Sequence, residues 1–235
     1  MDIQILGSSS KGNAYLVDIP ERGCCRLLLE AGMSWSLMQK LSDYELSNLD
    51  ACLISHEHGD HAKAAKEVMR HGIDVYTSRG TAEALGLQAD YRCHVVKPNE
   101  TVTFYPGIEA MALPVEHDAA EPFAWLIRDA FYGTDEMLLF ATDTPYLPYN
   151  IPGLTHAMVE ANYSADLMNQ DDAALNRRVM RSHMSIDALE RWLETGTSAQ
   201  TLQQIWLLHL SDDRSDAEQF KRRIQAASGA AVYID

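Results

Sequence analysis

Three histidines and two acids fall within ten residues of this sequence. The stretch ISHEHGDHAK, residues 54–63, places His56, His58, Asp60 and His61 directly after an apolar run. Histidine and aspartate fit a hydrophobic core poorly, and a solvated loop needs no such density of them. Imidazole and carboxylate groups are suitable ligands for Zn²⁺, Mn²⁺ or iron. Four such groups exceed what one tetrahedral site takes from a local segment, so the stretch predicts a site for divalent metal with room for two ions.

The spacing of these residues indicates the backbone that carries them. His56 and His58 are two residues apart, which puts them on one side of an extended segment but on different sides of a helix. Gly59 permits a sharp turn, after which Asp60 and His61 can face back from the start of a helix. We therefore expect the motif to join the end of a strand to the next helix.

Three further ligand-type residues follow apolar runs later in the chain. His117 comes after the run that ends in PV, Asp143 follows LLFAT, and His209 follows IWLL. A lone histidine such as His117 is equally consistent with a structural role when it is taken by itself. Because sites in α/β proteins are usually built at the ends of strands, we expect all three at one shared edge.

Elements that alternate along the chain must position these residues. Short apolar runs bounded by turn residues are typical of strands, whereas apolar residues spaced three or four apart are typical of helices. The pattern predicts an α/β (or α+β) fold with strands outnumbering helices. Strands are expected at 2–6, 13–18, 26–30, 50–54, 74–76, 94–97, 101–104, 108–115, 123–128, 137–142, 156–160 and 204–209, and helices at about 34–42, 61–71, 81–87, 185–195 and 214–227.

The composition bounds the class of protein. The chain has 235 residues, is 46% hydrophobic and carries a formal net charge of −15. It shows no repeat or linker, so we expect a single domain over 1–235. It also shows no membrane-length apolar run and no signal-peptide pattern at its start, which favours a cytoplasmic protein with no membrane partner and with its four cysteines reduced. The acidic balance counts against broad affinity for nucleic acid without excluding a local basic surface.

The ordered ligand set resembles that of the metallo-β-lactamase superfamily. Its signature matches the 56–61 stretch, and its later ligands match His117, Asp143 and His209 in order. The resemblance implies a four-layer αβ/βα sandwich with two divalent metal ions, Zn or Mn with Fe as a further option. It implies that one ion is held by His56, His58 and His117 and the other by Asp60, His61 and His209, with Asp143 between them.

Other segments resemble the YycJ/WalJ-type proteins of this superfamily, a family of metal-dependent DNA exonucleases. They are GSSSKGNAYLV at 7–17, LLLEAG at 27–32, VEANY at 159–163, NRRVM at 176–180, SHMS at 182–185 and HLSDD at 209–213. Two positions depart from the family: Glu30 stands where it has aspartate, and Tyr163 where it has histidine. These departures concern the choice of substrate more than the fold or the metal ligands.

Residues beyond the ligands are candidates for catalysis and substrate binding. The resemblance implies that Asp60 or Asp143 orients the nucleophile and takes its proton. His183, just before a predicted helix, could contact a phosphate or protonate a leaving group, although a helix-start histidine can also be purely structural. The remaining candidates, which turn chemistry or a solvated face would explain equally well, are the loop residues Ser8, Ser9, Lys11 and Asn13, the residue Asn162, and Arg178 within the basic stretch that also contains Arg177 and Arg181.

Together these features predict a metal-dependent phosphodiester hydrolase. The favoured reading is a DNA nuclease of the 5′-to-3′ exonuclease type, in which two metal ions activate a water and the substrate is a linear end or a single strand. One alternative is a phosphodiesterase for small molecules or cyclic nucleotides, for which the acidic charge matters less. A second alternative, from a different class, is a metal-binding interaction module without catalysis, which the complete ligand set disfavours.

Overall fold

A computed structural model describes residues 1–20, 25–130, 135–168, 173–196 and 198–234. The chain divides into two compact units, which are described in turn. The first comprises residues 1–114 and 119–134, and the second comprises residues 115–118 and 135–235.

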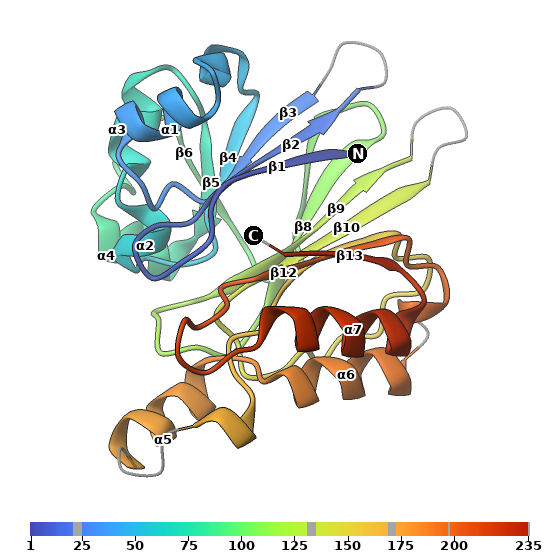
Figure 1. The fold of residues 1–235 in the computed structure, drawn as a ribbon. Coiled ribbons are helices and arrows are strands. Elements are labelled where there is room, and N and C mark those ends of the chain that lie inside the picture. Colours follow the sequence, from blue (N-terminus) through green and yellow to red (C-terminus); the bar gives the residue numbers. More distant parts are fainter. Residues whose placement is uncertain (21–24, 131–134, 169–172, 197, 235) are drawn as a thin grey trace. The chain divides into compact units, whose positions relative to one another are not determined.

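The first unit contains a six-stranded sheet with its strands in sequence order (Figure 1). β1 and β2 form an antiparallel hairpin and β2 pairs antiparallel with β3, after which β3 to β6 run parallel. The parallel strands β3 and β4 are apolar and buried apart from Arg26, as expected for strands covered by crossing helices. The strands are β1 (Asp2–Gly7), β2 (Ala14–Ile19), β3 (Cys25–Leu29), β4 (Ala51–Leu53), β5 (Val75–Ser78) and β6 (Cys93–Val96).

Short helices make the parallel connections of this sheet, and a contiguous core fills the space between them and the strands. The core includes Leu28, Met38, Cys52, Val68 and Val75, each fully buried. Figure 1 shows these helices gathered beside the sheet. They are α1 (Trp35–Leu41), the 3₁₀ turn η1 (Glu45–Asn48), α2 (Gly59–Ala62), α3 (Ala65–Arg70) and α4 (Arg79–Leu85).

Three antiparallel strands complete the first unit: β7 (Thr101–Tyr105), β8 (Ile108–Pro114) and β9 (Phe123–Asp129). Trp125 and Phe123 on β9 are fully buried, and their rings meet edge to face with centroids 6.0 Å apart.

The second unit is built on four parallel strands in the order β10, β11, β12 and β13. Leu138, His156, Gln204 and Ala231 lie side by side at the start of the register, so the carboxyl ends of the strands also align. Every residue of β11 is buried, as expected for a parallel strand covered on both faces. The strands are β10 (Glu136–Ala141), β11 (His156–Glu160), β12 (Gln204–Leu208) and β13 (Ala231–Ile234).

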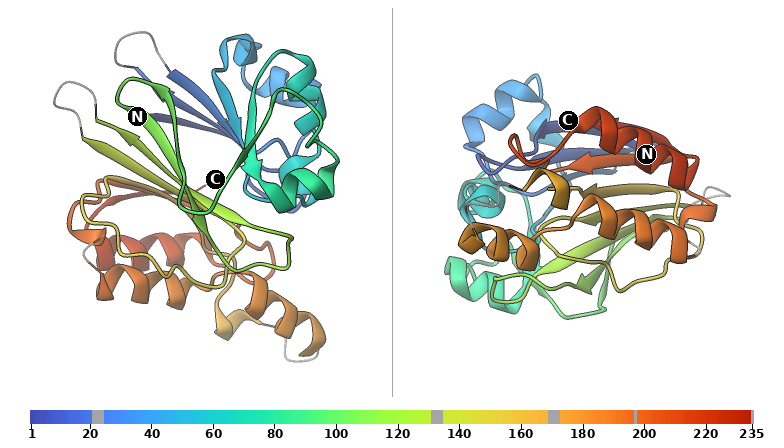
Figure 2. Two further views of the ribbon diagram at one scale, coloured as in Figure 1. Left: turned by 180° about the vertical axis from the view of Figure 1, so that it is seen from behind. Right: turned by 60° about the horizontal axis from the view of Figure 1, so that its bottom comes forward.

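Two helices of this unit, α6 (Ile186–Thr195) and α7 (Ala217–Ser228), lie side by side in the views of Figures 1 and 2. The predicted start of α6 is confirmed, since the Ser185 hydroxyl accepts a hydrogen bond from the Ala188 N–H at 3.1 Å. The unit also contains α5 (Ala173–Ser182) and the 3₁₀ turns η2 (Ala165–Leu167) and η3 (Ser198–Gln200).

The α/β prediction is confirmed, but one expected helix differs and two elements were not expected. The single helix expected at 61–71 is two helices, because the Ala64 N–H donates to the carbonyl of Ala31 and thereby leaves the helical ladder. The helix α5 was not expected, since its stretch buries little beyond Val179. The four-residue β13 was also missed, being too short to show a pattern.

Among the described residues, no helix is long and apolar enough to cross a membrane. Cys25, Cys52 and Cys93 are free thiols, in line with the prediction, and Cys24 lies outside the described residues.

Candidate metal centre

The histidine-rich motif follows β4 directly, as its spacing predicts. His56 Nε2 lies 3.1 Å from His58 Nδ1, and the other nitrogen of His56 lies 2.8 Å from the Ser55 hydroxyl. Two imidazoles that bind one tetrahedral zinc ion place their nitrogens about 3.3 Å apart. Asp60 and His61 then sit in the first turn of α2, with Asp60 Oδ2 and His61 Nε2 3.5 Å apart. The motif therefore presents converging donor atoms of the predicted types.

Two neighbouring segments hold the motif in place through its backbone. The Asn13 N–H donates to the Asp60 carbonyl at 2.8 Å, and the Ala31 N–H donates to the His61 carbonyl at 2.7 Å. Gly32 lies so close that a Cβ there would be 1.6 Å from the Asp60 carbonyl oxygen. Only glycine allows this approach, which explains the glycine of the LLLEAG segment.

A buried carboxylate stands behind His61. Glu30 follows β3, is fully buried, and places Oε2 3.7 Å from His61 Nδ1, while its other oxygen accepts the Ser55 N–H at 3.1 Å. Burial raises the pKa of Glu30, and the bond to His61 offsets part of that rise. A carboxylate behind a ligand histidine orients the ring and increases its basicity.

The candidate substrate-binding residues of the loop at 8–13 differ in their surroundings. The Asn13 side chain is fully buried, 3.1 Å from the Asp60 carbonyl and 3.2 Å from His61 Nε2, so it positions the motif. Ser8 is buried and accepts a hydrogen bond from the Tyr15 hydroxyl at 3.0 Å. Lys11 is exposed and Ser9 half-buried. Substrate contacts by these four residues stay a prediction.

The second unit brings together residues that follow three neighbouring parallel strands. Asp143 follows β10, Glu160 ends β11, and His209 follows β12, so the aligned carboxyl ends of the strands place all three at one edge. His209 Nδ1 lies 3.1 Å from Asp143 Oδ1 and 3.2 Å from Glu160 Oε1. Asp143 and His209 have φ angles of 50° and 57°, a left-handed backbone that costs energy for such residues and clusters at functional sites.

His183 makes the shortest contact of this group. Its Nδ1 lies 2.6 Å from Glu160 Oε1 and 3.7 Å from Asp143 Oδ1. Burial would lower the pKa of His183, but the charge of Glu160 and the bond to it raise that pKa above its usual value. Glu160 also accepts the backbone N–H groups of Met184 and Thr144, at 3.2 and 3.3 Å. Burial would raise the pKa of Glu160, yet the charge of His183 and the hydrogen bonds lower it, which favours the charged form of the pair.

His209 is also protonated when no metal is bound. Burial would lower its pKa, but the hydrogen bonds to Asp143 and Glu160 outweigh burial and raise the pKa to about 10. A metal ligand must be neutral, so a cation at this edge would replace that proton.

His117 reaches the same edge from the segment 115–118. Its Nδ1–H donates to the Ser182 carbonyl at 3.1 Å, which leaves Nε2 3.5 Å from Asp143 Oδ2. A backbone carbonyl that accepts from one ring nitrogen directs the other toward a metal, as is common for ligand histidines. The structure therefore brings His117, Asp143 and His209 together, as the strand-end argument predicts.

The donor chemistry of this edge fits a divalent cation. Asp143, Glu160, His183 and His209 each offer one atom, and these four atoms lie within 4.8 Å of one another. Mixed imidazole and carboxylate sets suit Zn²⁺, Mn²⁺ and iron.

The other candidates of this unit have distinct surroundings. The Asn162 side chain is buried and donates to the His209 carbonyl at 2.8 Å, so it positions that residue. Arg178 lies on α5 and is exposed, as are Arg177 and Arg181. Three further histidines stack on aromatic rings, in keeping with structural roles: His71 on Trp35, His94 on Tyr76 and His156 on Trp206.

Sequence reasoning missed Glu160 and Glu30 as members of these sites. Both are acids that directly follow apolar residues, AMV before Glu160 and LLL before Glu30, much as Asp143 follows LLFAT. Applying the strand-end argument to every acid would have found them.

These features define a class of protein. The family model for the beta-lactamase superfamily domain matches residues 25–205, and the chain belongs to this family. The structure of the metallo-beta-lactamase fold protein YhfI from Bacillus subtilis is similar, with a TM-score of 0.73 at 16% identity over 99% of this chain and 95% of that one. The predicted metallo-β-lactamase fold is therefore confirmed.

Two relatives are more similar in sequence. The exodeoxyribonuclease WalJ of Streptococcus pneumoniae is 28% identical over 234 residues, which cover 91% of this chain and 83% of WalJ. The exodeoxyribonuclease YycJ of Bacillus anthracis is 26% identical over 235 residues, which cover 93% of this chain and 85% of YycJ.

Proposed function

We propose that this protein is a metal-dependent phosphodiester hydrolase that acts as a DNA exonuclease. The observation that carries the proposal is the set of imidazole and carboxylate groups gathered at strand ends, His56 to His61 in one unit and Asp143 with its neighbours in the other. The relatives WalJ and YycJ are named exodeoxyribonucleases and cover most of the chain, which supports DNA as the substrate.

The proposal includes two divalent cations per chain, Zn²⁺ or Mn²⁺. Their ligands are the seven residues His56, His58, Asp60, His61, His117, Asp143 and His209. When bound, such ions supply a water of lowered pKa and charge that stabilises the oxygens of a phosphodiester. Asn13, Glu30 and Asn162 hold the ligand segments in place through the contacts described above.

The chain's own residues supply the proton transfer. His183 is held by Glu160 through Nδ1, and the charge of Glu160 raises the pKa of His183, which favours the protonated ring. Among the described residues no partner lies on Nε2 of His183, and the side chain is 20% exposed. In the proposed step, the oxygen of a water forms a bond to phosphorus while the P–O bond to the departing group breaks. Nε2 of His183 gives its proton to the departing oxygen, which leaves as an alcohol, and Asp60 or Asp143 takes the proton of the attacking water.

The substrate is tested by comparing DNA with its competitors. The Mn²⁺-loaded protein is incubated with end-labelled linear single-stranded DNA, closed circular DNA, RNA and a cyclic nucleotide. Progressive shortening of linear DNA with the circle left intact supports the exonuclease. Cleavage of the circle would indicate an endonuclease, and turnover of the cyclic nucleotide alone would assign the small-molecule phosphodiesterase instead.

A further inference from the structure

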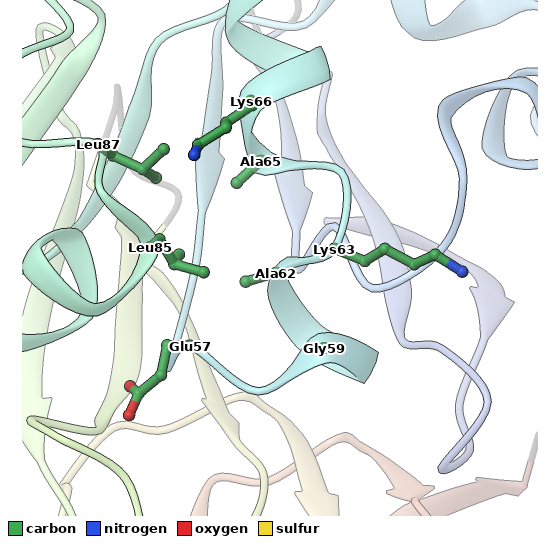
Figure 3. A pocket seen from close by; sticks show the side chains of 8 residues that line it. All are labelled: Glu57, Gly59, Ala62, Lys63, Ala65, Lys66, Leu85 and Leu87. Atoms are coloured by element: carbon green, nitrogen blue, oxygen red, sulfur yellow. The ribbon is translucent and has the colours of Figure 1, made fainter.

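A pocket in the first unit begins at the metal-binding motif itself. It is lined by Glu57 and Gly59 of that motif, by α2 and α3, and by the end of α4, and its volume is about 210 Å³ (Figure 3). A Cβ on Gly59 would meet no atom within 4 Å, so the pocket is open at the point where it meets the motif.

The floor of the pocket is apolar and belongs to the buried core. Ala62, Ala65 and Leu87 are each at most 3% exposed and belong to the hydrophobic core, and Leu85 packs against that core. Such a surface is suited to a flat or aliphatic group rather than to an ion.

Two lysines line the same pocket. Figure 3 shows Lys66 extending toward Leu87, whereas the ammonium of Lys63 points away from both leucines. The Lys66 ammonium lies 3.9 Å from the position of a Cβ on Gly86, next to the carboxyl end of α4. Neither lysine forms an ion pair with any residue that the structure describes.

The one carboxylate of the pocket does not neutralise these lysines. Glu57 Oε1 accepts the Ala120 N–H at 2.7 Å, and Oε2 accepts the Thr81 hydroxyl at 3.3 Å. Figure 3 shows the carboxylate of Glu57 turned away from both ammonium groups. The two lysines therefore keep their positive charge beside an apolar surface, in a chain whose net charge is −15.

We infer that this pocket binds one nucleotide of the DNA strand that continues beyond the scissile phosphate. The base or sugar lies against Ala62, Ala65, Leu85 and Leu87, and the phosphates contact Lys66 and Lys63. The inference rests on the proposed function and adds a subsite to it. The apolar surface suits the base or sugar of a nucleotide, and the lysines suit its phosphate. A single-stranded DNA chain offers both groups at each position.

Binding is tested without cleavage by using a fluorescent single-stranded oligonucleotide with hydrolysis-resistant phosphorothioate linkages and the Mn²⁺-loaded protein. The affinity is measured over a range of salt concentrations for the wild type, K63Q, K66Q and the double variant. The matched control is K40Q/K97Q, which removes the same charge from exposed lysines outside the pocket. The slope of log Kd against log salt is expected to fall by about 0.7 for each pocket lysine lost and to stay unchanged in the control.

A second measurement locates the base directly. An oligonucleotide containing photoreactive 4-thiothymidine is crosslinked to the wild-type protein, and the modified peptide is identified by mass spectrometry. Crosslinks within residues 57–66 or 85–87 support the subsite. If the wild type cleaves DNA but K63Q/K66Q binds like the control and crosslinks fall elsewhere, the subsite is overturned while the proposed function stands. If the wild type neither cleaves nor binds DNA, both are overturned.

Discussion

His183 Nδ1 and Glu160 Oε1 lie 2.6 Å apart, and the carboxylate of this pair is fully buried while the imidazole is partly exposed. Glu160 is the last residue of β11, and His183 lies in the segment between α5 and α6. This arrangement raises the pKa of the exposed partner and fixes which of its nitrogens faces outward.

The first prediction concerns this pair. His183→Ala should lower kcat by about 100- to 10,000-fold, as expected for loss of a general acid, and should leave the metal content unchanged. Elemental analysis of the purified variant provides that control. If the variant loses bound metal along with activity, His183 is a ligand and the proposed role is wrong.

Glu160→Gln tests the partner by a different readout. Removing the charge of Glu160 should lower the pKa of His183, so the decline of activity with rising pH should begin at a lower pH than in the wild type. The pH profile of kcat measures this shift. If the pH profile is unchanged and activity is lower at every pH, Glu160 has a structural role and does not set the pKa of His183.

Glu30 should affect metal affinity without touching the metal. Glu30→Gln removes the charge 3.7 Å from His61 Nδ1 and should weaken metal binding by about 10- to 100-fold. Titration with a competing chelator measures the affinity. Glu67→Gln, an exposed acid on α3, is the matched control, and equal affinities for all three proteins would contradict the role of Glu30.

The stability of the metal-free protein should depend on His209. Its folded-state pKa of about 10 lies above the usual 6.5, so its contribution is fully present below about pH 6.5 and is lost as the pH rises through about 10. Urea unfolding of the chelator-treated protein should show this decline. His209→Gln should show a smaller one, and identical declines in both proteins would contradict the raised pKa.

The parts of the site that could be predicted from the sequence are those whose chemistry is concentrated or follows a strand. The motif at 56–61 stands out by density, and Asp143 and His209 by their place after apolar runs, since parallel strands bring their carboxyl ends to one edge. Short apolar runs bounded by turn residues likewise predicted most of the strands. These inferences need only local sequence and general rules of sheet geometry.

Other features depend on long-range contacts that no local pattern contains. The break between α2 and α3 arises because Ala31, over thirty residues earlier, accepts the Ala64 N–H. The positioning role of Asn13 depends on its approach to His61, 48 positions later. Likewise, α5 has few buried positions, so its basic stretch resembled a solvated segment more than a helix.

A further prediction concerns the number of metal ions that the protein binds. Elemental analysis after dialysis against Zn²⁺ or Mn²⁺ should give about two ions per chain, and His61→Ala should reduce that number and abolish hydrolysis. Circular dichroism of the variant checks that it is folded. A folded variant with full activity would remove His61 from the ligand set.

The central claim is tested most directly by measuring DNA cleavage after the metal is removed and again after it is restored. Linear single-stranded DNA labelled at its 5′ or its 3′ end is incubated with the chelator-treated protein, before and after Mn²⁺ is restored. We expect no cleavage without metal, and with Mn²⁺ an early release of the 5′ label as a short product while the 3′-labelled strand shortens progressively. No cleavage with any divalent metal, or cleavage that persists in the chelated protein, would contradict the assignment as a metal-dependent DNA exonuclease.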